Sequence, residues 1–337
     1  MNVLILGASS FIGVYCVNEL LNSGNNYNII GTGRNPKFKD YYYNLDIPYV
    51  NVDLNDPASY SALDKYEIDV VVLLAVKMPA NVEKNDRDDD IADYYQVNAV
   101  GTCYLMEYCR KRGINKVITY GSRFDTRLYG QGAIITENTP LNFSYKDDHV
   151  GYVLTNISKQ QILTYYNEKY GMQNIMFRIP SIFGLGPHGQ FCKDGVYVKS
   201  GLQIFMEKAV KGETIEVFGD PNTEKDLFYV KDLAYATRLA IDSITAKGFY
   251  NIGYDRNFTL PEIANAIVEV FSDPLNKSQI ILRKNVKNNG SFPLMDSSKV
   301  KKELGFRAKY SDIKDIMEDY KAEKKRGVYD KLFGVNL

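Results

Sequence analysis

The chain has 337 residues, of which 45% are hydrophobic and 24% charged, enough apolar material for one or two folded cores. Basic and acidic side chains both number 41, so the formal charge is zero, and this balance argues against a nucleic-acid partner. No apolar run approaches the roughly 18 residues that span a bilayer, and the N-terminus lacks a basic segment with a cleavage site, so we expect a cytoplasmic protein without membrane contact.

The first 180 residues alternate short aliphatic runs with segments of helical periodicity. Strands are predicted at residues 2–7, 27–31, 49–53, 70–75, 116–120 and 174–178, and helices at 11–21, 93–112 and 153–170. This alternation predicts an α/β fold, a Rossmann-type doubly wound parallel sheet. The regularity weakens after residue 180. We therefore expect a sheet domain over residues 1–180 and a smaller C-terminal lobe over 181–337, parts of which return to the sheet domain.

Cysteine and histidine usage predicts no structural metal. Cys16, Cys103, Cys109 and Cys192 have no Cys-x-x-Cys spacing, and only two histidines are present, which indicates reduced thiols and no zinc site. The acidic run at residues 86–90 lacks the glycine and the spaced glutamate of an EF-hand loop, so we interpret it as a solvated loop.

A turn at residues 7–13 joins the first predicted strand to the first predicted helix. Gly7 and Gly13 bracket it, while Ser10 stands where a Gly-x-x-Gly-x-x-Gly pattern has its middle glycine. In this position backbone N–H groups and the helix dipole face a pyrophosphate. Glycines also serve tight turns for structural reasons alone, so the evidence for a dinucleotide site is the strand-turn-helix context.

Two later positions bear on which dinucleotide binds. The second strand ends without an acidic residue and with Arg34, which favours the 2′-phosphate of NADP over NAD. Asp53 has the chemistry to accept a hydrogen bond from the adenine amino group, but it is equally suited to capping a helix that follows Leu54.

Several further segments stand in a characteristic order. They are residues 7–13, 52–54, 73–75, 98–102, Ser122, 129–130, 158–159, Arg178, 183–184, 228–232 and 296–305. With them the chain resembles, over nearly its whole length, the extended short-chain dehydrogenase/reductase family, the NAD-dependent epimerases and dehydratases that modify nucleotide sugars. The resemblance implies NAD or NADP as cofactor, a nucleotide-diphosphate sugar as substrate, and a homodimer formed by the helices at 93–112 and 153–170.

The resemblance also implies which residues bind the cofactor. These are Gly7, Ser9, Ser10, Phe11, Ile12, Gly13, Arg34, Asp53, Leu54, Leu74, Ala75, Asn98, Tyr120 and Lys159. Residues 1–180 are then the NAD(P)-binding domain, and residues 181–337 mainly the substrate-binding lobe.

In this family a serine or threonine and a Tyr-x-x-x-Lys pair carry the reaction. Ser122 and Lys159 match, but Thr155 stands at the tyrosine position, and an alcohol's pKa is far too high for acid-base work. Three explanations stay open. Thr155, Ser122 and Lys159 could hold a water that relays the proton, Tyr152 could reach in from nearly two turns away, or the chemistry could be lost. We place catalysis at Ser122, Thr155 and Lys159, following the first.

The substrate side is altered as well. Ser181 stands where the family commonly has asparagine, and Lys225 stands where an arginine usually binds the diphosphate, which a lysine can do as a point charge. Ser122 would contact the reacting hydroxyl. The sequence thus predicts hydride transfer, at C4 of the sugar, in surface polysaccharide or deoxysugar biosynthesis. Epimerisation, oxidation and reduction stay open, and dehydration is disfavoured because Arg123 replaces an acidic pair. The alternative is a non-catalytic dinucleotide-binding sensor or partner subunit.

Overall fold

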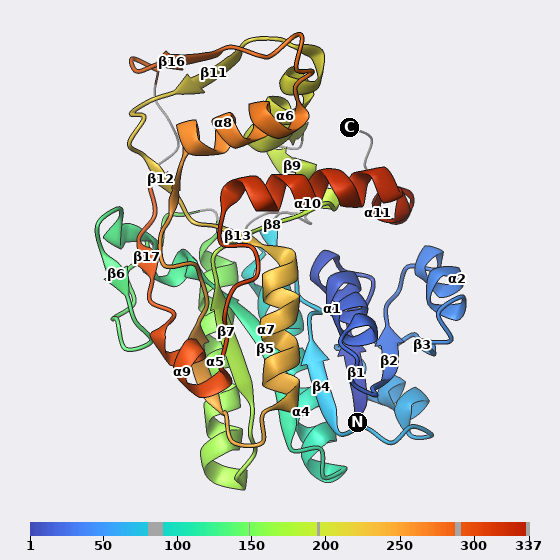
Figure 1. Cartoon of the computed structure of the whole chain (residues 1–337). Helices are drawn as coiled ribbons and strands as arrows, with labels where there is room; N and C mark the ends of the chain where they lie inside the picture. The colour runs from blue at the N-terminus through green and yellow to red at the C-terminus, as the bar shows by residue number, and fades with distance from the viewer. Residues whose placement is uncertain (80–89, 148, 194–195, 287–290, 335–337) are drawn as a thin grey trace.

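The computed structural model describes residues 1–79, 90–147, 149–193, 196–286 and 291–334 (Figure 1). The acidic run interpreted above as a loop lies outside these residues except for Asp90, whose carboxylate accepts a hydrogen bond from Ala92 N and caps a helix. Within the described ranges, no helix is both long and apolar enough to cross a membrane.

A seven-stranded sheet in which every neighbouring pair is parallel forms the centre of the molecule. Its order is β14-β7-β5-β4-β1-β2-β3, and each link is parallel. The strands are β1 (Asn2–Leu6), β2 (Asn28–Thr32), β3 (Tyr49–Val50), β4 (Val70–Leu73), β5 (Lys116–Ser122), β7 (Ile175–Ile179) and β14 (Gly248–Asn251). The order reverses between β1 and β4, as in a doubly wound fold. The predicted fold class is confirmed.

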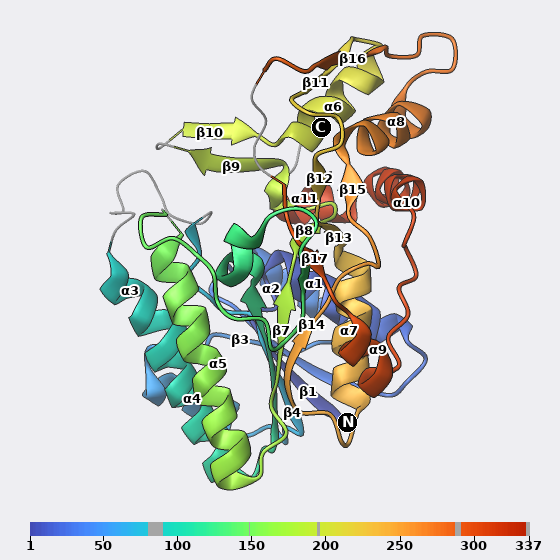
Figure 2. The same cartoon turned by 90° about the vertical axis from the view of Figure 1, so that its left-hand side faces the viewer.

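Helices cover both faces of the sheet (Figure 2). They are α1 (Phe11–Asn22) and α7 (Val230–Asp242) on one face, and α4 (Gly101–Lys111) and α5 (Val150–Tyr170) on the other. Alternate residues of β1 enter different cores: Val3 and Ile5 pack with α1 and α7, whereas Leu4 and Leu6 pack with the α4 and α5 side. Alternate side chains point to opposite faces of the sheet, and both faces are buried. Each strand is therefore a continuous apolar run in the sequence.

The helix predicted at residues 93–112 is interrupted. It consists of α3 (Ile91–Tyr95), a π-helical turn η3 (Gln96–Val100) and α4. The third strand was predicted at residues 49–53, but residues 51–53 are not in the sheet. The Asp53 carboxylate accepts a hydrogen bond from Asn55 N, and the chain turns there.

The second half of the chain forms a lobe above the carboxyl ends of the strands (Figure 1). Short strand pairs join β8 to β13, β11 to β16, β12 to β15 and β9 to β10, and α6, α8 and α10 pack around them. However, β14 is a strand of the central sheet and α7 packs on one of its faces, although both follow residue 180. A division at residue 180 stays a prediction.

The remaining elements complete the chain. Those between the sheet strands are α2 (Lys37–Tyr43), η1 (Pro57–Leu63), η4 (Arg123–Tyr129) and β6 (Ile134–Ile135). Those of the lobe begin with β8 (Ser181–Phe183), η5 (Pro187–Gly189), β9 (Gln190–Lys193), β10 (Val196–Lys199), α6 (Gly201–Lys211) and β11 (Ile215–Phe218). They continue with β12 (Glu224–Lys225), β13 (Leu227–Tyr229), β15 (Phe258–Thr259), α8 (Leu260–Phe271) and β16 (Ile280–Arg283). They end with β17 (Leu294–Met295), α9 (Ser298–Leu304), α10 (Ile313–Arg326) and α11 (Val328–Phe333).

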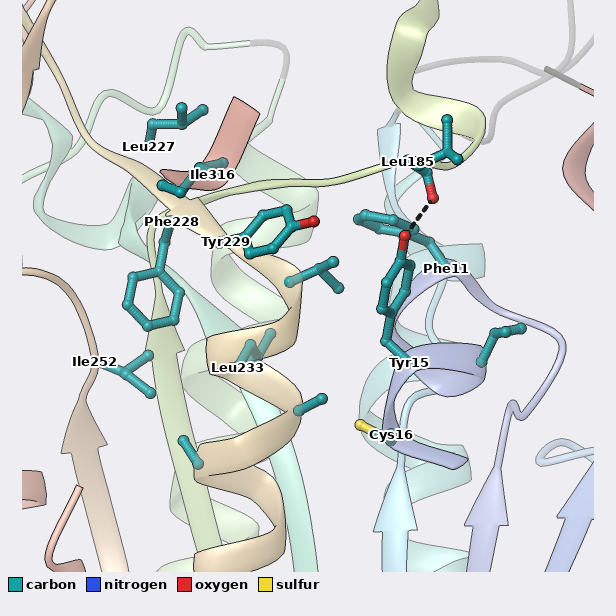
Figure 3. Close-up of a cluster of buried hydrophobic side chains, with 14 of the residues drawn as sticks. Phe11, Tyr15, Cys16, Leu185, Leu227, Phe228, Tyr229, Leu233, Ile252 and Ile316 are labelled. Atoms are coloured by element: carbon teal, nitrogen blue, oxygen red, sulfur yellow. Dashed lines mark hydrogen bonds between the residues drawn. The ribbon is translucent and has the colours of Figure 1, made fainter. Parts of the chain in front are cut away.

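The lobe is tied to the first helix of the sheet domain (Figure 3). The hydroxyl of Tyr15 on α1 donates a 2.9 Å hydrogen bond to Leu185 O, in the loop after β8. The same loop passes so close to Phe11 that a Cβ on Gly186 would lie 2.6 Å from the Phe11 ring carbon Cε2. Glycine at 186 therefore lets the lobe approach the start of α1 closely.

Candidate functional site

The turn between β1 and α1 has the geometry of a phosphate-binding turn. Gly7 has φ +97°, and a Cβ there would lie 2.9 Å from Ala75 N. A Cβ on Gly13 would overlap the carbonyl oxygen of Gly7 and lie 2.9 Å from the Cα of Ala8. Both positions therefore require glycine. Ser10 caps α1, because its Oγ accepts a 3.1 Å hydrogen bond from Gly13 N.

The other residues predicted at this turn differ in how much of their side chains is exposed to solvent. Ser9 and Ile12 are partly exposed, whereas Phe11 is buried against Tyr15 and Phe333. The Phe11 ring thus belongs to the core, and the contact it can offer a phosphate is its main-chain N–H at the start of α1.

The segment after β4 lies directly against this turn. Leu74 N and Ala75 N both donate to Leu6 O, at 2.8 and 3.0 Å. The next stretch is held by the buried Asn98 of η3, whose side chain donates to Lys77 O and accepts from Lys77 N. The structure thus brings Leu74, Ala75 and Asn98 to the same edge of the sheet as the turn, with the Asn98 amide hydrogen-bonded to the Lys77 backbone and to Thr155 Oγ1.

Residues predicted to select the dinucleotide lie at neighbouring strand ends. Arg34 is exposed just beyond β2. Asp53 does not cap a helix, since Asp56 is the N-cap of η1; its carboxylate instead accepts from Asn55 N at 2.9 Å. Leu54 is buried, and a Cβ on Gly101 would lie 3.1 Å from its Cβ. The helix-cap interpretation of Asp53 is therefore wrong.

The phenol of Tyr120 points away from this edge. Its ring is buried in the core that α1 and α7 share, and its hydroxyl lies 2.7 Å from Thr237 Oγ1 and 4.0 Å from Cys16 Sγ. Because alternate residues of a strand face opposite sides, Tyr120 can contribute only main-chain atoms to a ligand on the other face.

Lys159 has the most unusual electrostatic setting of the candidate residues. It lies on α5 with 3% of its surface exposed, and burial lowers its pKa from 10.5 to about 7. Burial is the sole cause of the shift; no neighbouring carboxylate in the described part of the chain opposes it. A buried cationic group whose pKa is strongly shifted by desolvation is a candidate for a functional site.

Thr155 is fully buried, and its hydroxyl is committed to other contacts. Its Oγ1 donates its single proton to the helix carbonyls of Gly151 and Tyr152, both at 3.0 Å, and accepts a 3.0 Å hydrogen bond from Asn98 Nδ2. Thr155 therefore ties α5 to η3. These contacts leave it poorly suited to hold a relaying water.

Two other α5 residues share a face with Lys159. Tyr152, Asn156 and Lys159 are spaced by four and three residues, which places them along one stripe of the helix. Asn156 Nδ2 donates to Tyr152 O at 3.0 Å, while its buried Oδ1 has no hydrogen-bond partner among the described residues. Asn156 is not among the residues predicted from the sequence; its helical spacing from Tyr152 and Lys159 is the signal that points to it.

Ser122 is the last residue of β5 and begins the turn η4. Its Oγ accepts a 3.3 Å hydrogen bond from Phe124 N, so the hydroxyl's own proton can be donated elsewhere. Helix α5 packs against both β5 and η4. Ser122 therefore lies at the strand end that the Lys159-bearing helix covers.

The predicted substrate residues meet at one buried carboxylate. Ser181 Oγ donates to Asp226 Oδ1 at 3.1 Å, Lys225 is its chain neighbour, and Arg123 Nε lies 2.9 Å from Asp226 Oδ2. Ser122, Ser181 and Lys225 thus belong to one region, which Asp226 and Arg123 connect. No sequence pattern points to this pair, because the partners are 103 positions apart and neither stands in a recognisable spacing.

A family model describes most of this chain. The model of the NAD dependent epimerase/dehydratase family matches residues 3–253. The chain belongs to this family. The resemblance read from the sequence is thereby confirmed, and the match covers the turn, the seven sheet strands and both faces described above.

Individual proteins extend this relationship. A putative UDP-glucose 4-epimerase of Methanocaldococcus jannaschii is 26% identical over 269 residues, which cover 79% of this chain and 81% of that protein. The solved UDP-glucose 4-epimerase of Thermotoga maritima with UDP-glucose has a TM-score of 0.74 at 21% identity, covering 97% and 99% of the two chains. The Thermus thermophilus UDP-glucose 4-epimerase complex with NAD has a TM-score of 0.69 at 23% identity, covering 97% and 100%. The fold is therefore shared throughout its length.

The residues present fit a dinucleotide cofactor of this family. Gly7 and Gly13 leave a turn without side chains at the start of α1, where the first helical N–H groups can receive a phosphate. On the other side of the sheet edge, the buried acceptor Asn156 Oδ1 and the cation Lys159 have no protein partner among the described residues. Hydroxyl groups of a ribose would satisfy both. No group of His, Cys, Asp and Glu within the described ranges is arranged to hold a metal ion.

Proposed function

We propose that the protein binds NAD or NADP at the turn of residues 7–13 and transfers hydride reversibly at C4 of the sugar in a nucleotide-diphosphate sugar. The observation that carries this proposal is the buried ammonium of Lys159 on the helix that covers the end of β5, where Ser122 stands. The family membership and the UDP-sugar epimerases among the relatives support the substrate class. The relatives also include a dTDP-4-dehydro-6-deoxyglucose reductase, so reduction stays within the proposal.

Each residue of the proposed site has a separate role in binding or in the reaction. When bound, the nicotinamide supplies the acceptor and donor of the hydride. Ser122 donates its hydroxyl proton to the reacting oxygen of the sugar and so holds that oxygen in place. Lys159 provides positive charge beside the ribose, and Lys225 provides it for the diphosphate. The group that takes the sugar hydroxyl proton on oxidation, and returns it on reduction, must be a stronger acid than a threonine.

Tyr152 is the group that we assign to this proton. Thr155 gives its only proton to helix carbonyls, which removes the support for the water relay. Tyr152 is half-buried, and desolvation raises the pKa of its phenol, so a nearby cation is needed to make it a base. Lys159 follows Tyr152 by seven residues on α5, about 10 Å along the helix axis at 1.5 Å per residue, so the assignment requires the two side chains to lean together.

Two isosteric variants test this assignment. Tyr152→Phe should slow single-turnover hydride transfer to a nucleotide sugar by roughly 10²–10⁴, while dinucleotide binding survives. Thr155→Val should mainly lower stability. The measurement is stopped-flow absorbance of the reduced nicotinamide. A large kinetic loss in Thr155→Val with a silent Tyr152→Phe would restore the water relay instead.

The second candidate function is a dinucleotide-binding sensor or partner subunit without turnover, which the threonine at position 155 favours. The nucleotide that copurifies with the protein distinguishes the two. Bound NADH, seen by its absorbance and mass, indicates an enzyme that keeps its cofactor between half-reactions. Failure of every nucleotide sugar to react with unsubstituted protein would favour the sensor.

The proposal also includes a cytoplasmic homodimer that works in surface polysaccharide or deoxysugar biosynthesis. Its structural support is the outer surface of α4 and α5, where Tyr104, Tyr165 and Tyr170 are exposed. Aromatic residues exposed on two neighbouring helices are common where such surfaces pair. Sedimentation velocity of the purified protein tests this: a monomer at micromolar concentration would remove the dimer from the proposal.

A further inference from the structure

The end of β2 has no side chain at Gly33, because other residues fill the space that a side chain would need. A Cβ on Gly33 would overlap the hydroxyl oxygen of Tyr49 and Ser9 Oγ. In a doubly wound fold this strand end lies beside the 2′ oxygen of the adenosine ribose, and a carboxylate there accepts hydrogen bonds from the ribose hydroxyls of NAD. Position 33 cannot supply such a carboxylate here.

The phenol of Tyr49 joins the two segments that flank this position. Tyr49 lies on β3, next to β2 at the edge of the sheet (Figure 1). Its hydroxyl donates a 3.2 Å hydrogen bond to Asn35 O, in the loop that also carries Arg34. The side chain of Ser9, in the turn between β1 and α1, hydrogen-bonds to the same phenol. Tyr49 thus ties the loop of Arg34 to the turn that we propose binds the dinucleotide.

The Tyr49 ring is itself held against that turn. It stacks on the ring of Tyr42, with centroids 5.3 Å and planes 20° apart, and the Tyr42 hydroxyl donates a 2.6 Å hydrogen bond to Ala8 O. Desolvation raises the pKa of the Tyr49 phenol, and the hydrogen bond with Ser9 only partly opposes this shift. The phenol therefore stays protonated at neutral pH and keeps its bond to Asn35 O.

Arg34 carries a positive charge that the protein does not neutralise locally. It is exposed, and within the described ranges its guanidinium has no hydrogen-bond or ion-pair partner. A phosphate on the 2′ oxygen of the adenosine ribose has the charge and the acceptor oxygens that a guanidinium binds best. The strand end thus combines an available cation with a position from which a carboxylate is excluded.

We propose that Tyr49 is a positioning residue for the 2′-phosphate of NADP, because it keeps the loop of Arg34 against the turn between β1 and α1. This inference rests on the proposed function, from which it takes the place of the dinucleotide. Arg34 provides the charge for the phosphate, Tyr49 fixes the main chain beside Arg34, and Gly33 leaves room for the phenol. The ligand class is an adenine nucleotide with a phosphate on its 2′ oxygen.

Two fragments of the cofactor test the proposal on the intact protein. Adenosine 2′,5′-bisphosphate carries the 2′-phosphate and 5′-AMP lacks it, so the ratio of their dissociation constants reports that phosphate without any turnover. Isothermal titration calorimetry gives both constants, and thermal melting shows that each variant is folded. Tyr49→Phe keeps the ring on Tyr42 and removes the hydroxyl. We expect it to weaken the bisphosphate about 3- to 10-fold, as for one hydrogen bond, and to leave 5′-AMP nearly unchanged.

A double variant shows whether Tyr49 acts through Arg34. In protein that already carries Arg34→Ala, Tyr49→Phe should cause no further loss of bisphosphate affinity, because the group that it positions is gone. The matched control is Tyr41→Phe. The Tyr41 ring also packs on Tyr42, with centroids 5.1 Å apart, but its hydroxyl donates to Asn18 Oδ1, away from the loop of Arg34. This control should leave the ratio unchanged.

The possible outcomes separate the inference from the proposed function. An unchanged ratio in folded Tyr49→Phe would overturn the role of Tyr49, and so would equal losses for both fragments, which would mean that Tyr49 shapes only the turn. A bisphosphate that binds the unsubstituted protein no more tightly than 5′-AMP would also overturn the inference, while NAD binding would keep the proposed function intact. If the unsubstituted protein binds neither fragment and neither dinucleotide, both fail.

Discussion

The buried ammonium of Lys159 makes the free energy of unfolding depend on pH in a predictable direction. Because burial lowers its pKa from 10.5 to about 7, the unfolded chain binds more protons at this site than the folded protein between these two pH values. Stability therefore rises with pH across this window. Below about pH 7 both states are protonated, and the full cost of the buried charge is present.

The size of the effect follows from the same shift. A fall from 10.5 to about 7 corresponds to about 5 kcal/mol at 1.36 kcal/mol per pKa unit, as an upper bound, since sites relax and admit water. Lys159→Met keeps most of the side-chain length and removes the charge. We expect this variant to raise the free energy of unfolding by about 2–4 kcal/mol at pH 7, with the gain vanishing toward pH 10.

Urea denaturation of the protein without added cofactor, at several pH values between 7 and 10, measures this gain by linear extrapolation. Lys169→Met is the control, because Lys169 is exposed on the same helix. A gain that is the same at every pH, or a destabilisation at pH 7, would refute the reasoning. The same variant should lose affinity for the dinucleotide, measured by calorimetry; unchanged affinity would remove Lys159 from the site.

Three other substitutions have defined outcomes. Gly13→Ala brings a Cβ onto the carbonyl of Gly7, so thermal melting should show a large loss of stability and calorimetry a loss of dinucleotide binding. For Arg34, titration should show NADP binding at least as tightly as NAD, with Arg34→Ala weakening NADP selectively; NAD binding ten times better to the unsubstituted protein would contradict this. Tyr15→Phe deletes the bond to Leu185 O and should cost about 1–3 kcal/mol in urea denaturation, and a change under about 0.3 kcal/mol would show that water replaces the phenol there.

The α/β architecture was predictable because it depends on local patterns. A strand buried on both faces reads as an apolar run, as in Val70–Leu73, and a helix between such runs must cross over in the right-handed sense. The glycines at 7 and 13 were likewise readable, since a tight strand-to-helix turn leaves no room for a Cβ. The same local information placed Ser122 at a strand end and Lys159 within a helix.

The interruption of the helix at residues 93–112 was not predictable in this way. Its periodicity is helical throughout, but a π-helical turn forms where Asn98 bonds to Lys77 and Thr155. Those partners lie 21 and 57 positions away. A local pattern cannot report a hydrogen bond of that span.

The role of Thr155 was also decided by tertiary structure. The sequence shows a threonine where the family has a tyrosine, and its hydroxyl alone is compatible with holding a water. Packing of α5 against η3 buries that hydroxyl and pairs it with Asn98. Burial and partner choice are properties of the assembled fold, because they depend on which distant segments arrive at the same place.

By itself the sequence therefore determined the fold class, the glycine turn between β1 and α1 and the family, since each is encoded in residues close together along the chain. Tertiary structure decided the electrostatics of the site. The pKa of Lys159 is lowered only because other elements exclude water from it, and Arg123 pairs with Asp226 only because the fold brings η4 to the residue between β12 and β13. Desolvation and charge pairing act through space, so they appear only once the chain is folded.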